Sequence, residues 1–252
     1  MLSIAILLIT VLLLIISLYQ IRILKRINEK LIKLVSPERD VRRIAKAQSD
    51  AAWEHYRQSE YYAQLLRLLD LSAPIPSTRS WAASPDVLLT LLDLAKRAQP
   101  SHILDLGSGM STLVLAKSAP QATIISIDNS AEFAGKTKKL LETHGVTNVD
   151  LRVAPLTPHS SGVDWYDTSQ LRDISNIDLL FIDGPPGSKN PKARHPVIAE
   201  CLSRLSPRAI VVIDDAVRDG EKDMAHEFAK VLPNHRLEFL SHEKGTAVLL
   251  PR

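Results

Sequence analysis

Residues 103–112, with the sequence ILDLGSGMST, constrain the fold of this chain more than any other segment. An apolar run ends in an acid at Asp105, glycines follow at Gly107 and Gly109, and small hydroxyl residues then open an amphipathic stretch. This order predicts a buried strand, a tight turn and the first turn of a helix. In such an arrangement the backbone can come close to a ligand.

A second acid, Asp128, ends the next apolar run, residues 122–128. A carboxylate at that strand end is placed to accept hydrogen bonds from a ribose, so the two segments together predict a nucleoside cofactor. Dinucleotide sites carry the fingerprint G-x-G-x-x-G/A, and Thr112 stands here at the third position, which weakens a pyrophosphate interpretation. An ordinary glycine turn without a cofactor is the alternative.

Residues 103–112 resemble motif I of the class I S-adenosylmethionine-dependent methyltransferases, in which an acid precedes G-x-G. The resemblance implies that Gly107 and Gly109 let the loop pass under the methionine part of the cofactor. It also implies that Asp105 lies near the cofactor's ammonium group and that Asp128 holds the ribose hydroxyls. With two residues expected to border the adenine, Asn129 and Ala154, the candidate cofactor-binding residues are Asp105, Gly107, Ser108, Gly109, Ser111, Asp128, Asn129 and Ala154.

From residue 102 onward the chain alternates between strand and helix patterns. Solid apolar runs are typical of parallel strands that are buried on both faces, and the run of alternations predicts a doubly wound α/β fold. The expected strands are 102–106, 123–128, 149–153, 177–183, 208–214, 235–241 and 245–250, and the expected helices are 85–98, 111–118, 131–144, 190–205 and 220–231.

The last two strands of this series are joined by the short segment His242-Glu243-Lys244-Gly245, whose final residue also begins the last strand, and so short a connection fits only an antiparallel hairpin. Five parallel strands finished by such a hairpin resemble the mostly parallel seven-stranded sheet of the methyltransferases. A plain dehydrogenase Rossmann sheet has no such ending. The resemblance covers roughly residues 80–252.

The N-terminal segment predicts a transmembrane anchor over residues 1–21. Residues 4–21 hold thirteen Leu, Ile or Val side chains, and residues 1–21 hold no charged side chain. About 20 helical residues span the roughly 30 Å hydrocarbon core of a bilayer. A cleaved signal peptide lacks support, because no Lys or Arg precedes the apolar run and no A-x-A site follows. A buried helix of the globular domain is the other alternative.

Residues 22–46 carry nine Lys or Arg against three Asp or Glu, so the positive-inside rule places residues 22–252 in the cytoplasm. Residues 22–71 predict a basic helical linker, interrupted at Pro37, whose apolar stripe could lie on lipid or pair with a second copy in a homodimer. Its later aromatic residues could pack on the domain of residues 72–252 or line a substrate entrance. That domain is slightly acidic, so we expect no nucleic-acid partner.

Three carboxylates, Asp183, Asp214 and Asp215, end two neighbouring strands at the same edge of the sheet. Acids in such proximity repel unless they share a cation or a proton, and an oxygen-rich cluster suits Mg²⁺ or another divalent cation. The arrangement resembles the catechol-type metal-dependent O-methyltransferases, although those have Asp-Asn where this chain has Asp-Asp. The alternative for Asp215 is a helix cap or a salt bridge to Arg218.

Methyl transfer depends mainly on orientation, and a general base is needed only when the acceptor is a hydroxyl. Asp183 is the first candidate for that base and His195 the second. The basic loop of residues 185–195 could cover an acidic acceptor or could simply be solvated. We therefore expect an S-adenosylmethionine-dependent methyltransferase that acts on an oxygen acceptor, whether a small molecule, a lipid or a glycan, at the cytoplasmic membrane face. The alternatives are an NAD-dependent oxidoreductase and a non-catalytic membrane scaffold.

Overall fold

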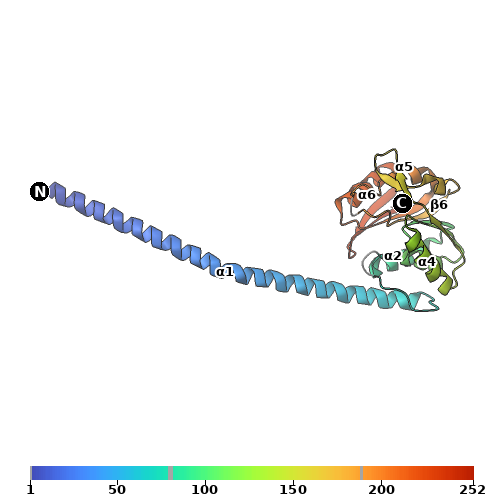
Figure 1. Ribbon diagram of the computed structural model, residues 1–252, viewed down its shortest axis with the longest axis horizontal. Helices are drawn as coiled ribbons and strands as arrows, with labels where there is room; N and C mark the ends of the chain where they lie inside the picture. Colours follow the sequence, from blue (N-terminus) through green and yellow to red (C-terminus); the bar gives the residue numbers. More distant parts are fainter. Residues whose placement is uncertain (1, 79–81, 188–189) are drawn as a thin grey trace. The chain divides into compact units, whose positions relative to one another are not determined.

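The computed structural model describes residues 2–78, 82–187 and 190–252, with side chains of the first helix described for residues 10–33 and from residue 40 onward. The chain divides into two compact units, Met1–His55 and Tyr56–Arg252. Residues 2–55 of the first unit belong to α1 (Leu2–Leu68), which begins in blue in Figure 1. The helix ends within the second unit.

The interruption expected at Pro37 is wrong, because α1 is one continuous helix. A proline removes one backbone donor from a helix, but the hydrogen bonds on either side can carry the helix past it. The expected anchor over residues 1–21 lies partly outside the described side chains, which begin at Thr10. No helix in the described part of the chain is both long and apolar enough to cross a membrane.

The second unit is built on a seven-stranded sheet with the strand order β3-β2-β1-β6-β7-β9-β8. The strands from β3 through β7 in that order are parallel, and β9 pairs antiparallel with both β7 and β8. This confirms the mostly parallel sheet with a terminal hairpin. The strands are β1 (His102–Leu106), β2 (Thr123–Asp128), β3 (Val149–Val153), β6 (Ile177–Ile182), β7 (Leu205–Asp214), β8 (His235–Leu240) and β9 (Thr246–Pro251).

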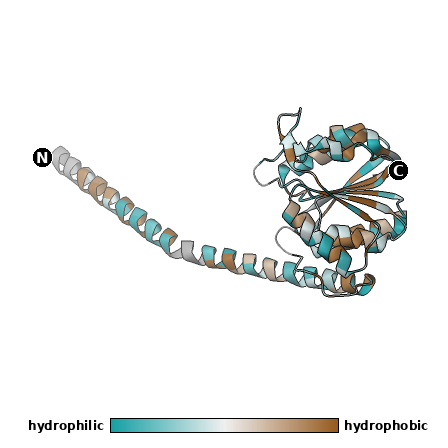
Figure 2. Ribbon diagram, turned by 45° about the vertical axis from the view of Figure 1, so that its right-hand side comes forward, coloured by the Kyte–Doolittle hydropathy of each residue, from teal (hydrophilic) through white to brown (hydrophobic). Residues whose placement is uncertain are grey.

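Helices cover both faces of this sheet, as Figure 2 shows by the brown strands between two layers of helix. One face packs against α2 (Pro85–Ala98), α3 (Met110–Ser118), α4 (Ala131–Thr143) and the end of α1. The other packs against α5 (Pro196–Cys201) and α6 (Asp219–Val231). The apolar strands are buried from both sides because neighbouring side chains on a strand point to opposite faces.

The end of α1 is fastened to α2 by packing and by a hydrogen bond. Leu65 is fully buried in the same core cluster as Leu88, and the Gln58 side-chain amide donates to the Asp86 carboxylate over 2.7 Å. Other apolar residues in this part of the helix, Tyr56, Leu66 and Leu68, are exposed. The packing interpretation of the linker therefore holds for Leu65 and, just past the end of the helix, for Leu69.

Two features differ from the sequence prediction. A small two-stranded sheet, β4 (Leu156–Pro158) and β5 (Asp164–Tyr166), and a 3-10 turn η1 (Thr168–Leu171) fill the stretch between β3 and β6. The helix expected over residues 190–205 begins only at Pro196, because residues 190–195 form successive tight turns, and it passes at its end into η2 (Leu202–Arg204).

Candidate active site

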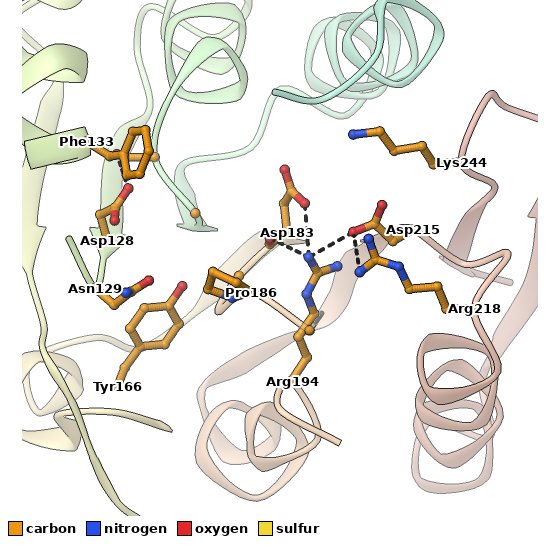
Figure 3. A pocket seen from close by; sticks show the side chains of 14 residues that line it. Asp128, Asn129, Phe133, Tyr166, Asp183, Pro186, Arg194, Asp215, Arg218 and Lys244 are labelled. Carbon is orange, nitrogen blue, oxygen red and sulfur yellow. Dashed lines mark hydrogen bonds and ion pairs between the residues drawn. The ribbon is translucent and has the colours of Figure 1, made fainter. Parts of the chain in front are cut away.

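A cavity opens where the strand order reverses between β1 and β6, at the carboxyl ends of the strands. Ligands of doubly wound sheets bind at this switch point. Figure 3 shows labelled side chains converging on it, most of them from the segments that follow β2, β6 and β7. The cavity is lined by Gly107, Ser108, Asp128, Asn129, Phe133, Tyr166, Asp183, Gly184, Pro186, Gly187, Arg194, Asp215, Arg218 and Lys244.

Gly107 allows two loops to meet at the floor of this cavity. Its φ is +113°, and a Cβ added there would lie 3.2 Å from the backbone carbon of Asp183 and 3.2 Å from the nitrogen of Gly184. Its own N–H donates to the Ile127 carbonyl over 2.9 Å. Only glycine combines this backbone conformation with so close an approach, so Gly107 joins the turn after β1 to the end of β6.

Asp105 is fully buried and is not among the residues that line the cavity. The Thr112 hydroxyl donates to its carboxylate over 2.6 Å, the Ser126 hydroxyl over 3.1 Å and the Ser111 hydroxyl over 3.4 Å. Burial raises the pKa of Asp105 to about 7, although these hydroxyls act in the opposite direction. The expected contact of Asp105 with the cofactor's ammonium group stays a prediction. In the structure its carboxyl fastens the start of α3 to β1 and β2.

Thr112 has a positive role that the sequence did not reveal. Its hydroxyl accepts a hydrogen bond from the Gly109 N–H over 3.0 Å while donating to Asp105, so it holds the glycine turn and the buried acid together. In the sequence this role is signalled by a hydroxyl residue in place of the third glycine of the dinucleotide fingerprint. On its own, that substitution argues only against a pyrophosphate site.

Asp128 faces the cavity from the end of β2, as its sequence position predicts. One carboxylate oxygen accepts from the Ser108 hydroxyl over 2.6 Å and the other from the Ser130 N–H over 2.8 Å. Ser130 also caps α4 by accepting from the Phe133 N–H. The carboxylate is thus held in one orientation, with lone pairs left for a ligand.

The adenine side of the expected site is only partly as predicted. Asn129 lines the cavity, whereas Ala154 is fully buried and lies outside the lining, with its N–H donating to the Asp128 carbonyl. Ser111 is likewise buried behind the turn. Phe133, on the first turn of α4, lines the cavity with its ring 47 % exposed. An apolar ring at this position was missed because one aromatic residue on a helix gives no sequence signal.

Asp183, Asp214 and Asp215 form the acidic edge of the cavity. This acidic edge is organised around Arg194, whose side chain is 4 % exposed. Its Nη2 lies 2.9 Å from a carboxylate oxygen of Asp215 and 3.3 Å from one of Asp183, and it donates to the Asp183 carbonyl over 2.7 Å. Arg218 approaches the same Asp215 oxygen to 3.0 Å from the more exposed side. The predicted salt bridge between Asp215 and Arg218 is therefore confirmed (Figure 3).

Asp214 differs from its two neighbours. Its side chain is fully buried, and no side chain in the described part of the chain offers it a hydrogen bond. Burial and the adjacent Asp215 raise the pKa of Asp214 to about 6. Burial, with the nearby Asp214 charge, raises the pKa of Asp183 well above its usual range. Both carboxyls therefore hold a proton more readily than an exposed aspartate does.

The described residues contain no group of three or more Asp, Glu, His or Cys side chains arranged to hold a metal ion. The expected metal site at Asp183, Asp214 and Asp215 does not fit the structure. The Arg194 guanidinium stands between Asp183 and Asp215, and Asp214 is buried behind them.

His195 does not reach this cavity. It precedes α5 and lines a separate surface hollow with His159 and Glu227. Arg194 enters the cavity and the next residue leaves it, because adjacent side chains in this turn point in different directions. The structure therefore brings Asp183, but not His195, to the candidate site.

Tyr166 enters the cavity from β5, the small sheet that the sequence did not predict. The residue is 1 % exposed, and its hydroxyl has no hydrogen-bond partner among the described residues. A Cβ at Gly184 would collide with that hydroxyl, so Gly184 leaves the space that the phenol occupies. A buried hydroxyl without a partner at the wall of a cavity is suited to meeting a polar ligand.

Two family models match the chain. The model described as a methyltransferase domain matches residues 104–216, and that of the protein-L-isoaspartate(D-aspartate) O-methyltransferases matches residues 26–156. The two overlap on the glycine turn and Asp128, and both describe methyltransferases. No curated protein sequence matches the chain significantly.

Solved structures share the fold at low sequence identity. A SAH-bound methyltransferase from Podospora anserina superposes with a TM-score of 0.56 at 16 % identity, covering 82 % of this chain and 95 % of that one. An O-methyltransferase from Bacillus cereus in complex with SAH gives 0.56 at 16 %, covering 80 % and 97 %. The O-methyltransferase TomG from Streptomyces achromogenes, in complex with SAM, gives 0.51 at 22 %, covering 77 % and 88 %.

Proposed function

The chain belongs to the class I S-adenosylmethionine-dependent methyltransferases, and from this premise we propose that it transfers a methyl group from S-adenosylmethionine to an oxygen acceptor. One observation carries the proposal. A single cavity joins the glycine turn and Asp128, which suit the cofactor, to Asp183, a carboxyl whose pKa is raised. Binding and proton acceptance can therefore take place side by side.

The residues on the cofactor side fit S-adenosylmethionine. Gly107 and Ser108 present backbone close to the cavity, Asp128 presents a fixed carboxylate for ribose hydroxyls, and the Phe133 ring presents an apolar surface. The unpartnered Tyr166 hydroxyl adds a polar group at the same wall. When bound, the cofactor supplies a methyl group on a positively charged sulfur, which any well-placed nucleophile can accept.

On the acceptor side, Asp183 is proposed as the general base. Two hydrogen bonds from Arg194, to its carbonyl and to its carboxylate, fix its position. Its raised pKa makes the ionised carboxylate a stronger proton acceptor than an exposed aspartate, as removal of a hydroxyl proton requires. The remaining contribution is orientation of the acceptor oxygen, which accounts for much of the rate in such displacements.

We extend the proposal to location and partners. Residues 1–21 would anchor the chain in a membrane with residues 22–252 on the cytoplasmic side, and the acceptor would be a small molecule, lipid or glycan met there. The apolar composition of residues 4–21 and the basic flank of residues 22–46 support this location. A homodimer through the apolar stripe of the linker belongs to the same proposal. An NAD-dependent oxidoreductase and a non-catalytic scaffold are not favoured, since both family models describe methyltransferases.

Calorimetric titration of the full chain tests the function. We expect S-adenosylhomocysteine to bind and NADH not to bind. Asp128→Ala should weaken the S-adenosylhomocysteine affinity at least about tenfold, because it removes a charged hydrogen-bond acceptor worth roughly 1.5–3 kcal/mol. The matched control is Asp223→Ala, an exposed aspartate on α6, which should leave the affinity unchanged. Binding of NADH alone, or equal affinities for both variants, would contradict the assignment.

A further inference from the structure

All three nitrogens of the Arg194 guanidinium make hydrogen bonds inside the acidic edge. The Nε donates to the Pro185 carbonyl over 3.1 Å, and Nη1 lies 3.3 Å from the Asp214 carbonyl. The Nη2 makes the contacts to Asp183 and Asp215 described above. One buried guanidinium thus ties the end of β6 to the end of β7 and to the turn that follows β6.

The same guanidinium fills the position that a metal ion would need. A divalent cation binds carboxylate oxygens at about 2.0–2.6 Å around a common centre. Between Asp183 and Asp215 that centre is taken by Nη2, at 3.3 Å and 2.9 Å from their oxygens, as the dashed lines in Figure 3 show. A third acid, Glu221, is buried with an oxygen 3.7 Å from Nη1. A metal ion could enter only after Arg194 had left.

We propose that Arg194 is the built-in cation of this site, replacing the divalent metal ion of metal-dependent O-methyltransferases, so that the chain binds its cofactor and assembles its acidic edge without a metal. The inference rests on the proposed function for its chemical meaning, but its contacts do not depend on that function. An arginine keeps its charge at every physiological pH and matches carboxylates with a planar fork.

Arg194 in place of a metal ion also restricts the class of methyl acceptor that the site can take. A metal ion keeps open positions at which a substrate can coordinate through two adjacent oxygens. A guanidinium donates hydrogen bonds and has no coordination positions, and each nitrogen of Arg194 already donates to an acceptor in the protein. The acceptor class that fits is therefore a single hydroxyl. It would give its proton to Asp183 as its oxygen forms the bond to the methyl carbon, and the sulfur–methyl bond would break with S-adenosylhomocysteine as the leaving group. A chelating vicinal diol has no advantage here.

The test compares the wild-type full chain with Arg194→Ala, using Mg²⁺ and Mn²⁺ as probes. For the wild type we expect no heat of binding with either ion. We also expect an unfolding midpoint and an S-adenosylhomocysteine affinity that neither EDTA nor millimolar Mg²⁺ changes. Arg194→Ala removes the buried guanidinium from Asp183, Asp215 and Glu221 and leaves the last two with the partly exposed Arg218, so its midpoint should fall by roughly 10 °C. Mg²⁺ should restore part of that loss.

Two further variants keep the test decisive. Arg218→Ala removes a partly exposed arginine from the same Asp215, and we expect a small change in midpoint without a response to Mg²⁺. Arg194→Lys keeps the positive charge but loses the planar guanidinium. It replaces the alanine variant in the test if that variant does not fold. For Arg194→Lys we expect a smaller fall in the unfolding midpoint and a smaller response to Mg²⁺. Stoichiometric Mg²⁺ binding to the wild type that Asp215→Asn abolishes would overturn the inference, as would no Mg²⁺ response in either Arg194 variant. A different outcome would count against the proposed function instead. In that outcome the metal-free wild type does not bind S-adenosylhomocysteine, and added Mg²⁺ does not change this.

Discussion

Replacing Asp105 by asparagine should remove a pH dependence of stability that originates in the core. The pKa of Asp105 rises from 3.8 to about 7 on folding, because burial disfavours its charge. The native state therefore binds this proton more tightly than the unfolded state. The stability contributed by the protonated form is complete below about pH 4 and is lost as the pH rises to about 7.

The size of the effect follows from the shift. Each pKa unit corresponds to about 1.4 kcal/mol, so between about pH 4.5 and about pH 7.5 the wild type should lose about 3 kcal/mol through this group. Asparagine fits the same network. Its amide oxygen can accept from Thr112 and Ser126, and its amide nitrogen can face the Ser111 hydroxyl. The variant should therefore be the more stable protein at the higher pH.

Urea unfolding of wild type and Asp105→Asn at the two pH values measures this difference. Asp214 and Glu221, whose pKa values are also raised, contribute equally to both proteins, so the difference between the two pH slopes isolates Asp105. Asp223→Asn, at an exposed position, is the matched control and should keep the wild-type slope. The contradicting result is an Asp105→Asn protein that is less stable than the wild type at the higher pH and whose free energy of unfolding changes with pH as in the wild type. In that case the three hydroxyls stabilise an ionised carboxylate, and the reasoning fails.

Two further predictions concern the cavity. Gly107→Ala should destabilise the protein by roughly 2 kcal/mol and abolish S-adenosylhomocysteine binding, because its Cβ would press on the backbone of Asp183. Gly162→Ala, also at positive φ but with open space around its Cβ, should cost only about 1 kcal/mol and keep binding, and chemical unfolding with titration distinguishes the two. Tyr166→Phe should leave stability within about 0.5 kcal/mol, because the hydroxyl has no partner to lose, yet weaken S-adenosylhomocysteine binding by roughly fivefold. Unchanged affinity in the same titration would remove Tyr166 from the binding site.

The strands and the position of the site could be predicted because both depend on local patterns. Apolar runs identified most of the strands, and the acids at their ends marked the edge where Asp128 and Asp183 face one cavity. Segments without a periodic pattern of apolar residues could not be predicted. Residues 156–166 form a sheet too short to show alternation, so Tyr166 went unrecognised.

The charge pattern of the acidic edge was misread for a different reason. The distance between two residues along the sequence does not show which of their side chains face the cavity. Arg194 and His195 are neighbours in the chain, yet their side chains line different cavities. The three aspartates alone suggested a metal, because the cation that neutralises them lies eleven residues after Asp183, in a turn that was expected to be helix. Tertiary contacts, rather than local patterns, decided that point.

The small sheet formed by β4 and β5 has a consequence for how this enzyme could change its substrate over time. It lies outside the main sheet, so insertions or exchanges between residues 156 and 166 need not shift the register of any of the seven strands. Yet one of its side chains reaches the cavity wall. Variation at the other positions of such a peripheral segment can alter what is accepted while Tyr166 keeps its place in the cofactor half. Laboratory evolution of acceptor preference would therefore begin by randomising residues 156–165 with Tyr166 kept.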